Sequence, residues 1–364
     1  MKSLLRVATA MLITLLAAPT AFPCTTFVLE GDGQIYFGRN LDWDWENGLV
    51  IANPRGLKKT ALVDPGHPAA QWTSKYGSVT FNQFGLEEPF GGMNEAGLVI
   101  ENMMLFESRY PAPDSRSEID MLQWIQYQLD TCSTVAEVLA TDAKIRQPSP
   151  TVGARIHYLV CDAGGDCATV EFLNGKLVSH RGQALPYRVL ANDTYSRSVA
   201  YARTNPFPQG FAEPLTNRAS LARFACAAAR VAEFRPRTPE QNVGCAFEIL
   251  EQVRQGKGTV WQVVYDIPAR EIHYRTAGNP RTRSVRLGSF DFAHARTARF
   301  ANIQAGPSTA GHLDFVELTE ARHRQYLEAF FAQESLKKGL GDFTPRIDSY
   351  LAGLRAYTFV EPPP

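Results

Sequence analysis

Cys24 is well placed to act as a nucleophile, because it directly follows an N-terminal segment built like an export signal. If processing removes residues 1–23, its thiol and a free α-amine share one residue. An α-amine has an unperturbed pKa of about 7.7–8.0, so it can accept the thiol proton near neutral pH without a histidine. The alternatives at this position are a structural cysteine in a disulfide and a lipidated cysteine, whose thiol and amine would both be acylated.

The N-terminal segment itself predicts export. Lys2 and Arg6 give it a positive start, residues 7–18 are almost entirely apolar, and small residues follow. The apolar run is short for a bilayer span, which favours a cleaved signal over an uncleaved membrane anchor. Phe22 and Pro23 are larger than the residues that precede a lipidated cysteine. We therefore expect a periplasmic or secreted mature protein without membrane attachment after processing.

A predicted hairpin brings charged residues close to Cys24. The segment Gly31-Asp32-Gly33 reads as a turn between two strand-like runs, so the chain comes back beside its own start. Arg39 and Asp42 are then expected near the thiol. A guanidinium lowers the pKa of a thiol, and a carboxylate can hold an ammonium group. The alternative for these two residues is an ion pair at a strand end.

Two further segments carry polar residues at the ends of apolar runs. The stretch 94–97, Asn-Glu-Ala-Gly, reads as a turn that leads into a buried strand. The stretch 187–191 is an apolar strand that ends at Asn192. An asparagine there is either a turn residue or an amide donor aimed at an oxyanion, an effect that can be worth several kcal/mol of barrier.

In this order the segments resemble the choloylglycine hydrolase family, amidases with an N-terminal nucleophile that include penicillin V acylases and conjugated bile salt hydrolases. The resemblance rests on Cys24-Thr25-Thr26-Phe27, Gly38-Arg39-Asn40-Leu41-Asp42, Gly92-Met93-Asn94-Glu95-Ala96-Gly97-Leu98 and Val189-Leu190-Ala191-Asn192. It continues through Arg223-Phe224 and the strand 259–265. It implies an α+β fold, the four-layer αββα sandwich of N-terminal nucleophile hydrolases, and a maturation that exposes the cysteine amine.

The resemblance also implies catalytic roles. Cys24 would be the nucleophile with its own amine as base, and Asp42 would bind that amine. Arg39 would lie beside the sulfur. Asn192 would donate to the oxyanion, and Arg223 would support the cluster. The nearby arginine at position 218 is a weaker match for that last role, because no phenylalanine follows it.

Three residues bear on the substrate. The family usually has Asn or Tyr seven residues after the turn glycine, where this chain has Met104, so only a main-chain N–H is available there. Asn102 lies two residues earlier, on the same face of the strand. Trp43 begins a Trp-Asp-Trp-Glu run that forms an aromatic pocket wall or packs in the core. These departures rank bile salts below penicillin V and acyl homoserine lactones.

The expected activity is hydrolysis of the C–N bond of a linear N-acyl amide through a Cys24 thioester. The alternative is a catalytically silent or lipid-anchored relative that binds an acyl ligand. A papain-like enzyme would instead pair the thiol with His157, His180 or His273, but its local signature is missing. The histidines show no metal-ligand spacing, so we expect neither a metal nor a cofactor.

The balance of charged residues argues against two classes of binding partner. Lys and Arg total 37 and Asp and Glu total 37. Nucleic-acid binding and attachment to anionic membranes both need an excess of basic residues, so neither is expected. The expected partner is a small acyl amide, and homo-oligomer formation stays open.

The candidate site residues must be positioned by a fold in which groups of strands alternate with groups of helices along the chain. Strands are predicted at 25–30, 34–37, 155–161, 167–172, 259–265 and 271–274, and helices at 118–129, 133–141, 220–233, 239–254, 317–336 and 348–355. Ser133 is the expected cap of the second helix. No Pro/Gly/Ser-rich linker divides the chain, so we expect one domain over 24–364 after the segment 1–23, with 310–364 as a C-terminal helical extension.

The cysteine count fits this interpretation only in part. With Cys24 reserved for catalysis, five of the six cysteines remain. Cys161 and Cys167 flank a turn and can bridge opposite strands, and positions 226 and 245 lie on consecutive predicted helices that a disulfide can join. Cys132 is then the unpaired cysteine.

Overall fold

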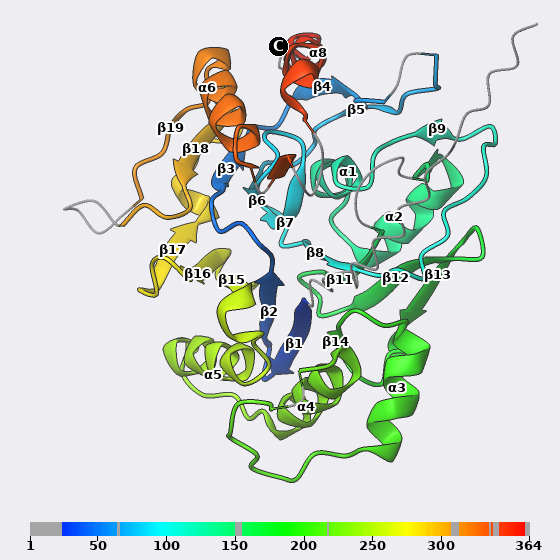
Figure 1. Cartoon of the computed structure of the whole chain (residues 1–364), viewed down its shortest axis with the longest axis vertical. Helices are drawn as coiled ribbons and strands as arrows, with labels where there is room; N and C mark the ends of the chain where they lie inside the picture. The colour runs from blue at the N-terminus through cyan, green and yellow to red at the C-terminus, as the bar shows by residue number, and fades with distance from the viewer. Residues whose placement is uncertain are drawn as a thin grey trace, which may run out of the picture.

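The computed structural model describes residues 24–63, 66–149, 155–216, 218–306, 313–334, 336–337 and 342–360 (Figure 1). The predicted export signal, residues 1–23, lies outside these ranges. Across the described residues, no helix has the length and apolar character that a membrane span requires.

Two antiparallel sheets form the centre of the molecule. The first is a six-stranded sheet with the strand order β14 (Val189–Leu190), β1 (Thr25–Gly31), β2 (Gln34–Asp42), β15 (Thr259–Asp266), β16 (Glu271–Thr276) and β17 (Arg283–Arg286). The strands β1 and β2, which carry the start of the described chain, lie in the middle of the molecule in Figure 1.

The second sheet has nine strands in the order β13 (Lys176–Arg181), β12 (Cys167–Leu173), β11 (Ile156–Cys161), β8 (Val99–Met104), β7 (Pro89–Asn94), β6 (Ser78–Asn82), β3 (Leu49–Asn53), β18 (Arg299–Asn302) and β19 (Val316–Glu317). Two small sheets lie beside it. One contains β20 (Thr358–Phe359), β4 (Leu57–Thr60) and β5 (Gln71–Thr73), and the other contains β10 (Ile145–Arg146) and β9 (Ser117–Glu118).

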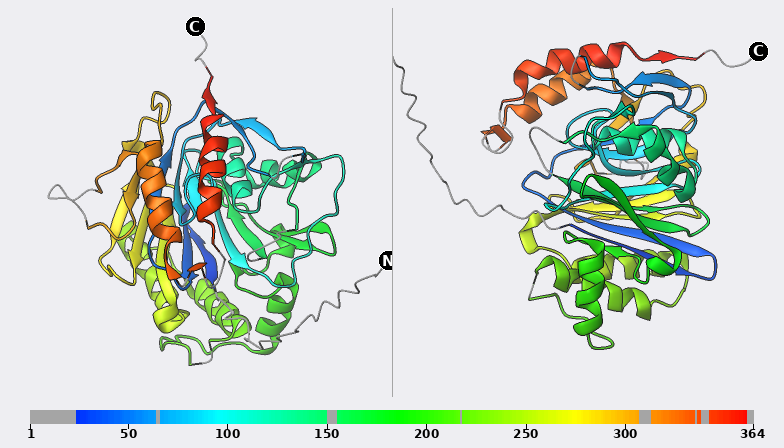
Figure 2. Two further views of the ribbon diagram at one scale, coloured as in Figure 1. Left: turned by 45° about the horizontal axis from the view of Figure 1, so that its top comes forward. Right: turned by 90° about the vertical axis from the view of Figure 1, so that its right-hand side faces the viewer.

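Helices cover the two outer faces. The outer side of the six-stranded sheet carries α3 (Tyr195–Thr204), α4 (Ser220–Glu233) and α5 (Pro239–Gln252). On the side of the nine-stranded sheet lie α1 (Gln123–Thr131), α2 (Val135–Ala140), α6 (Glu320–Phe331) and α8 (Ile347–Arg355). The right-hand view of Figure 2 shows the four layers in profile. The predicted αββα sandwich of the α+β class is therefore confirmed.

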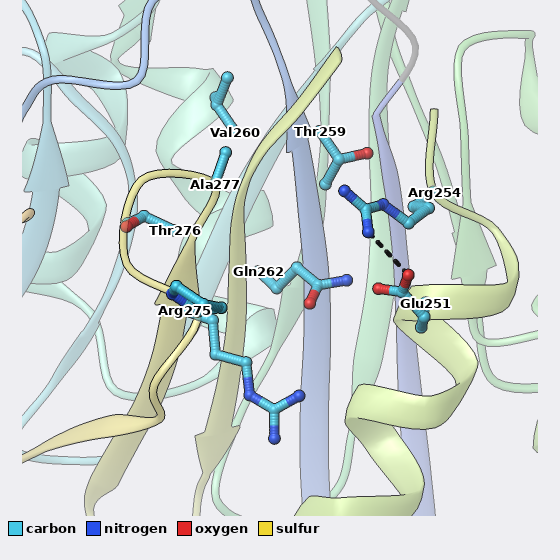
Figure 3. Close-up of a pocket in the computed structure, with 9 residues that line it drawn as sticks. Glu251, Arg254, Thr259, Val260, Gln262, Arg275, Thr276 and Ala277 are labelled. Atoms are coloured by element: carbon cyan, nitrogen blue, oxygen red, sulfur yellow. Dashed lines mark hydrogen bonds and ion pairs between the residues drawn. The ribbon is translucent and has the colours of Figure 1, made fainter. Parts of the chain in front are cut away.

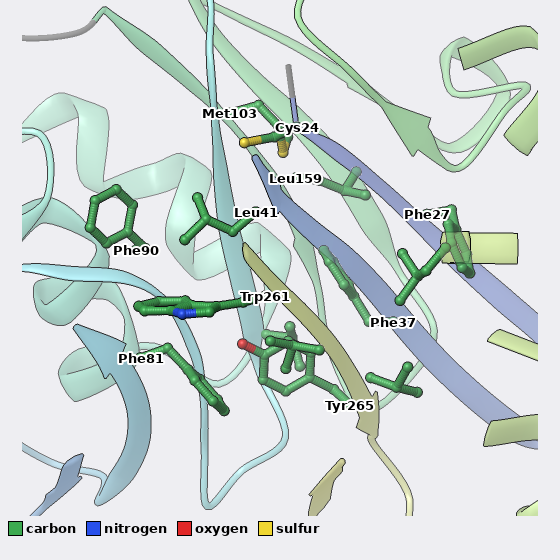
Figure 4. Packing of buried hydrophobic residues seen from close by; sticks show 14 of the residues in the cluster. Cys24, Phe27, Phe37, Leu41, Phe81, Phe90, Met103, Leu159, Trp261 and Tyr265 are labelled. Carbon is green, nitrogen blue, oxygen red and sulfur yellow. The ribbon is translucent and has the colours of Figure 1, made fainter. Parts of the chain in front are cut away.

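The space between the sheets is filled by apolar side chains from both of them. Phe37, Trp261 and Tyr265 come from the six-stranded sheet, and Phe81 and Met103 come from the nine-stranded sheet (Figure 4). These side chains are at most 1% exposed. Burial of this much aromatic surface fixes the spacing of the two sheets and therefore the distance between residues on facing strands.

The β1–β2 hairpin brings the polar residues back to Cys24, as predicted. Gly31 pairs with Gln34, which leaves a two-residue turn. Asp32 has φ 51° and Gly33 has φ 73°, the left-handed conformations of a type I′ turn. Because the register continues to Thr25 opposite Asn40, the end of β2 lies directly beside Cys24.

Some predicted elements differ in their bounds. Helix α1 begins at Gln123, five residues after the predicted start, because Glu118 belongs to β9 and pairs with Arg146. Helix α2 is capped by Thr134, whose hydroxyl accepts from the Glu137 N–H, so the prediction of a Ser133 cap is wrong. Strands β3 to β7 were not predicted, since long-range pairing and not local pattern stabilises them, and helix α3 was not predicted either.

The cysteines follow the prediction for one pair only. Cys161 and Cys167 are joined by a disulfide across the β11–β12 hairpin. Cys226 on α4 and Cys245 on α5 are free, so the second predicted pair is wrong. Cys226 is fully buried while Cys245 is part-exposed, so the two thiols lie at different depths of the helix layer. Cys132 is free and buried.

Candidate active site

Cys24 directly precedes β1 and is 3% exposed. Its side chain belongs to the core between the sheets, in the same apolar cluster as Met103 (Figure 4). Met103 faces the six-stranded sheet because alternate residues of β8 do so, as the contact of Glu101 with Arg39 shows. Met103 was not predicted as a site residue, although the alternation that places Asn102 and Met104 on one face of the strand puts Met103 on the opposite face.

Arg39 is buried against the facing sheet. Its Nε lies 2.9 Å from Glu101 Oε2, and its Nη2 donates to the Asn102 carbonyl at 3.1 Å. Tyr265 donates its hydroxyl hydrogen to Glu101 Oε1. Burial raises the pKa of Glu101 to about 7, against the opposing effects of Arg39 and this hydrogen bond. Glu101 and Tyr265 were missed from the sequence because they join the two sheets across the core.

Glycine at position 91 makes room for this carboxylate. A Cβ at Gly91 would lie 2.2 Å from the carboxyl carbon of Glu101, its partner in the β7–β8 register. Any larger residue at position 91 would therefore push the Glu101 carboxylate away from Arg39.

Asp42 is the last residue of β2 and lies near the Cys24 thiol. It is 1% exposed and accepts a hydrogen bond from the Thr259 hydroxyl of the neighbouring strand β15. Burial raises the pKa of Asp42 to about 6, although Arg223, the Thr259 hydroxyl and Arg39 all favour the ionised form. Its main chain hydrogen-bonds to the Cys24 sulfur. Asp42 is thus a buried carboxylate placed beside the residue whose amine it was predicted to hold.

The Cys24 thiol is held in its protonated form. Burial raises its pKa, and this effect outweighs the opposing influence of Arg39, of the main-chain hydrogen bond from Asp42 and of Arg223, while the carboxylate charge of Asp42 raises the pKa further. A thiol in such a place needs a base to become a nucleophile.

Arg223 connects the predicted residues to one another. From α4, its Nη1 donates to the Cys24 carbonyl and to the Thr25 hydroxyl. Its Nη2 donates to Asn192 Oδ1 at 2.8 Å, and its Nε donates to the Arg218 carbonyl at 3.1 Å. The Arg218 side chain points elsewhere, with its Nε donating to the Leu215 carbonyl at 3.4 Å. The weaker match of Arg218 therefore agrees with the geometry.

Asn192 follows β14 and has a fixed amide orientation. Its main-chain N–H donates to the Ser220 hydroxyl at 2.8 Å, and its Nδ2 donates to the Met104 carbonyl at 2.9 Å. Leu105 donates to the Arg155 carbonyl, so Met104 occupies a non-hydrogen-bonded position of the β8–β11 ladder. Its carbonyl therefore points away from β11 and is available to Asn192.

Each of the three residues assigned to the substrate contacts neighbouring residues of the protein. Asn102 donates its amide to the Phe90 carbonyl at 2.6 Å, and its own carbonyl accepts from Arg39. Trp43 is 9% exposed, with ring centroids 5.4 Å from Trp45 and 6.0 Å from Phe90. Met104 meets Asn192 through its main chain, as described above. Trp43 and Trp45 thus belong to the same apolar cluster as Cys24.

A cavity of about 220 Å³ lies on the helical side of the six-stranded sheet (Figure 3). Its lining includes Arg254, Gln262, Arg275 and Thr259. Thr259 belongs to this lining and also donates its hydroxyl hydrogen to Asp42, as described above. Cys24 is not part of the lining, and its side chain packs on the other side of the sheet.

The histidines proposed for the papain-like alternative are engaged elsewhere. His157 contacts Glu171 and the Ala191 carbonyl, and His180 contacts hydroxyl groups. His273 lies on β16, which β2 and β15 separate from β1. Within the described residues, no group of three or more His, Cys, Asp or Glu side chains is arranged to hold a metal ion.

Comparison with known proteins gives one consistent result. A family model for linear amide C–N hydrolases, choloylglycine hydrolase family, matches residues 24–205. The penicillin V acylase of Pectobacterium atrosepticum is 28% identical over 338 residues, covering 80% of this chain and 88% of that protein.

Two solved structures are similar in fold. Penicillin V acylase from Agrobacterium tumefaciens has a TM-score of 0.67 at 25% identity, covering 76% of this chain and 91% of that chain. Conjugated bile acid hydrolase from Clostridium perfringens has a TM-score of 0.63 at 17% identity, covering 81% of this chain and 100% of that chain. The chain thus belongs to the choloylglycine hydrolase family and is a hydrolase of C–N bonds in linear amides.

Proposed function

We propose that the mature protein is a periplasmic or secreted amidase that cleaves a linear N-acyl amide through a thioester on Cys24. The observation that carries this proposal is the pair of contacts made by Arg223, which joins the Cys24 carbonyl to the Asn192 amide. Asp42 and Arg39 flank the same thiol. The family match also begins at Cys24, the residue that cleavage would make N-terminal.

The first half of the reaction forms the thioester. The α-amine takes the thiol proton, directly or through a water molecule, because the buried thiol does not ionise alone. The thiolate then attacks the substrate carbonyl, and the negative charge moves to its oxygen. Asn192 Nδ2 donates to this oxyanion, together with a main-chain N–H near Met104. As the C–N bond breaks, the α-ammonium returns its proton to the leaving amine.

The second half restores the enzyme. A water molecule gives one proton to the α-amine and attacks the thioester carbonyl, and the same oxyanion donors act again. The C–S bond breaks, the carboxylic acid leaves, and Cys24 regains its thiol proton. Asp42 keeps the α-amine oriented throughout, because a buried carboxylate stabilises the transient ammonium.

The substrate is proposed to be penicillin V, an acyl homoserine lactone or a related acyl amide. The penicillin V acylases named above support the first of these by similarity. Trp43, Trp45 and Phe90 form an apolar aromatic group directly after Asp42, which suits a hydrophobic acyl chain. Bile salt conjugates rank last, because Met104 replaces the family's usual Asn or Tyr.

The intact mass of the exported protein tests this proposal. A chain that begins at unmodified Cys24 is expected, and retention of Phe22 or acylation of Cys24 would exclude the mechanism. Rates with phenoxyacetyl amides, acyl homoserine lactones and bile salt conjugates then identify the substrate class. Cys24→Ser should lose nearly all turnover, whereas Cys226→Ser, which changes a buried cysteine on α4, serves as the matched control.

A further inference from the structure

The C-terminal helices α6 and α8 bind one short loop of the nine-stranded sheet. The loop, residues 83–88, joins β6 to β7. The two helices pack against each other on the side of that sheet (Figure 2), and they follow the residues 24–205 that the family model matches. The reaction proposed above uses no residue of either helix.

Three side chains of these helices hydrogen-bond to main-chain groups of the loop. From α6, Tyr326 donates its hydroxyl hydrogen to the Gln83 carbonyl at 2.8 Å. From the same helix, His323 Nε2 accepts from the Leu86 N–H at 3.2 Å. Burial lowers the pKa of His323 to about 4, so the ring is neutral near pH 7 and Nε2 can accept this hydrogen. From α8, Tyr350 donates its hydroxyl hydrogen to the Leu86 carbonyl.

Glycine at position 85 lets the two helices come this close to the loop. A Cβ at Gly85 would lie 2.6 Å from His323 Nε2 and 2.9 Å from the Tyr350 hydroxyl oxygen. Its φ of 107° is also a value that residues with a side chain rarely adopt. The loop is therefore shaped to receive both of these side chains.

The same loop contacts the aromatic group of Trp43, Trp45 and Phe90. Gln83 donates its side-chain amide to the Trp45 carbonyl at 2.5 Å. The ring centroid of Phe84 lies 5.5 Å from that of Phe90. One hydrogen bond and one ring contact therefore connect the loop to the group that was proposed to receive the acyl chain.

Aromatic rings of α6 pack on Phe84. The ring centroid of Phe330 lies 5.9 Å from that of Phe84, and Phe331 stacks on Phe84 with its centroid at 6.3 Å. Tyr326 stacks on Phe330 at 5.7 Å, so the residue that binds the Gln83 carbonyl also packs on these rings. Hydrogen bonds and apolar contacts thus both lead from α6 through the loop to the aromatic group.

We propose that Tyr326, His323 and Tyr350 position loop 83–88 and thereby determine which acyl groups the candidate site accepts. They are positioning residues, because they act on the substrate only through the loop. The inference rests on the proposed function for the acyl-binding role of the aromatic group. A large apolar acyl chain draws its binding energy from apolar contact area, so it loses affinity when the loop no longer holds that group in place. A short acyl chain uses little of this area and is affected less.

Tyr326→Phe is the informative variant, because it removes the hydrogen bond to Gln83 and keeps the ring that stacks on Phe330. Initial rates with a phenoxyacetyl amide and a butyryl amide of the same amine give kcat and KM for each substrate. We expect KM for the phenoxyacetyl amide to rise about threefold to tenfold, the loss that one neutral hydrogen bond represents. Its kcat, and both constants for the butyryl amide, should stay within about twofold of wild type.

Tyr357→Phe is the matched control. It removes a hydroxyl that donates to the Thr60 carbonyl at 3.1 Å, outside loop 83–88, so it should keep the wild-type constants for both substrates. Equal changes for the two substrates in Tyr326→Phe, or no change for either, would overturn the role in specificity.

The attachment of the loop is measured without turnover, by hydrogen–deuterium exchange of peptides that span residues 83–90. His323→Leu removes the acceptor of the Leu86 N–H, so it and Tyr326→Phe should both speed exchange there about threefold or more, and Tyr357→Phe should not. Thermal unfolding confirms that the variants compared are folded. Wild-type exchange in both loop variants would refute the attachment, whether or not the protein is an amidase. A wild type that hydrolyses no amide would instead refute the proposed function.

Discussion

Arg223 offers the sharpest test of the site, because its guanidinium bonds in three directions at once. Nη1 reaches the Cys24 carbonyl and Thr25, Nη2 reaches Asn192 Oδ1 at 2.8 Å, and Nε reaches the Arg218 carbonyl. Lysine keeps the positive charge but carries a single nitrogen on a flexible stem. Arg223→Lys therefore cannot hold the Cys24 carbonyl and the Asn192 amide together.

The size of the effect follows from the bond that is lost. A hydrogen bond from a charged donor contributes about 1.5–3 kcal/mol. If the contact with Asn192 is needed only in the transition state, the loss corresponds to about 10- to 100-fold in kcat with little change in KM. Asn192→Ala removes the oxyanion donor itself and should cost about 10²–10³-fold.

Initial rates of amide hydrolysis by wild type, the two single variants and the double variant measure the coupling. If Arg223 acts through Asn192, the double variant should match Asn192→Ala within about threefold. Arg218→Lys, whose side chain bonds to Leu215 and not to the cluster, should behave like wild type. Multiplied losses in the double variant, with all proteins folded by thermal unfolding, would refute the reasoning.

Three further predictions concern stability. In the uncleaved chain, folding raises the pKa of Asp42 from 3.8 to about 6. The free energy of unfolding of wild type should therefore fall, relative to that of Asp42→Asn, as the pH rises from about 4 to about 6. Thermal unfolding of both proteins at several pH values measures this difference. Gly91→Ala should lower stability by about 1–3 kcal/mol because its Cβ meets the Glu101 carboxyl, whereas Gly288→Ala, which meets nothing within 4 Å, should not. Removal of the Cys161–Cys167 bridge should cost about 2 kcal/mol in denaturant unfolding, and an unchanged midpoint would contradict the disulfide.

The part of the site that is close to Cys24 in sequence was predictable because a single hairpin forms it. A two-residue turn at Asp32 and Gly33 fixes the register, and the register alone places Asp42 beside Cys24. The helix that carries Arg223 was predicted with its observed bounds, since its apolar face follows the helical period. Both the hairpin and the helix were therefore predictable from local sequence patterns.

The residues that were missed depend on the distance between the sheets. Glu101 and Tyr265 belong to different sheets and meet only because the packed core sets that distance. The strand pattern of β8 shows that Glu101 is buried but not what faces it. The Glu171–His157 pair likewise exists only after β11 and β12 have paired. A sequence pattern has no information about such partners until the topology is known.

The charges around Cys24 also bear on how activity would depend on processing. Arg39 and Arg223 lower the pKa of the thiol, yet burial outweighs them and Asp42 opposes them. In the uncleaved chain the nitrogen of Cys24 is a peptide nitrogen and cannot accept a proton, so the buried thiol has no base of its own. On the proposed mechanism, removal of residues 1–23 supplies that base and places it beside Asp42. A chain with one extra residue before Cys24 should therefore fold with the wild-type unfolding midpoint but hydrolyse no amide, and measurable turnover by such a chain would show that the α-amine is not the base.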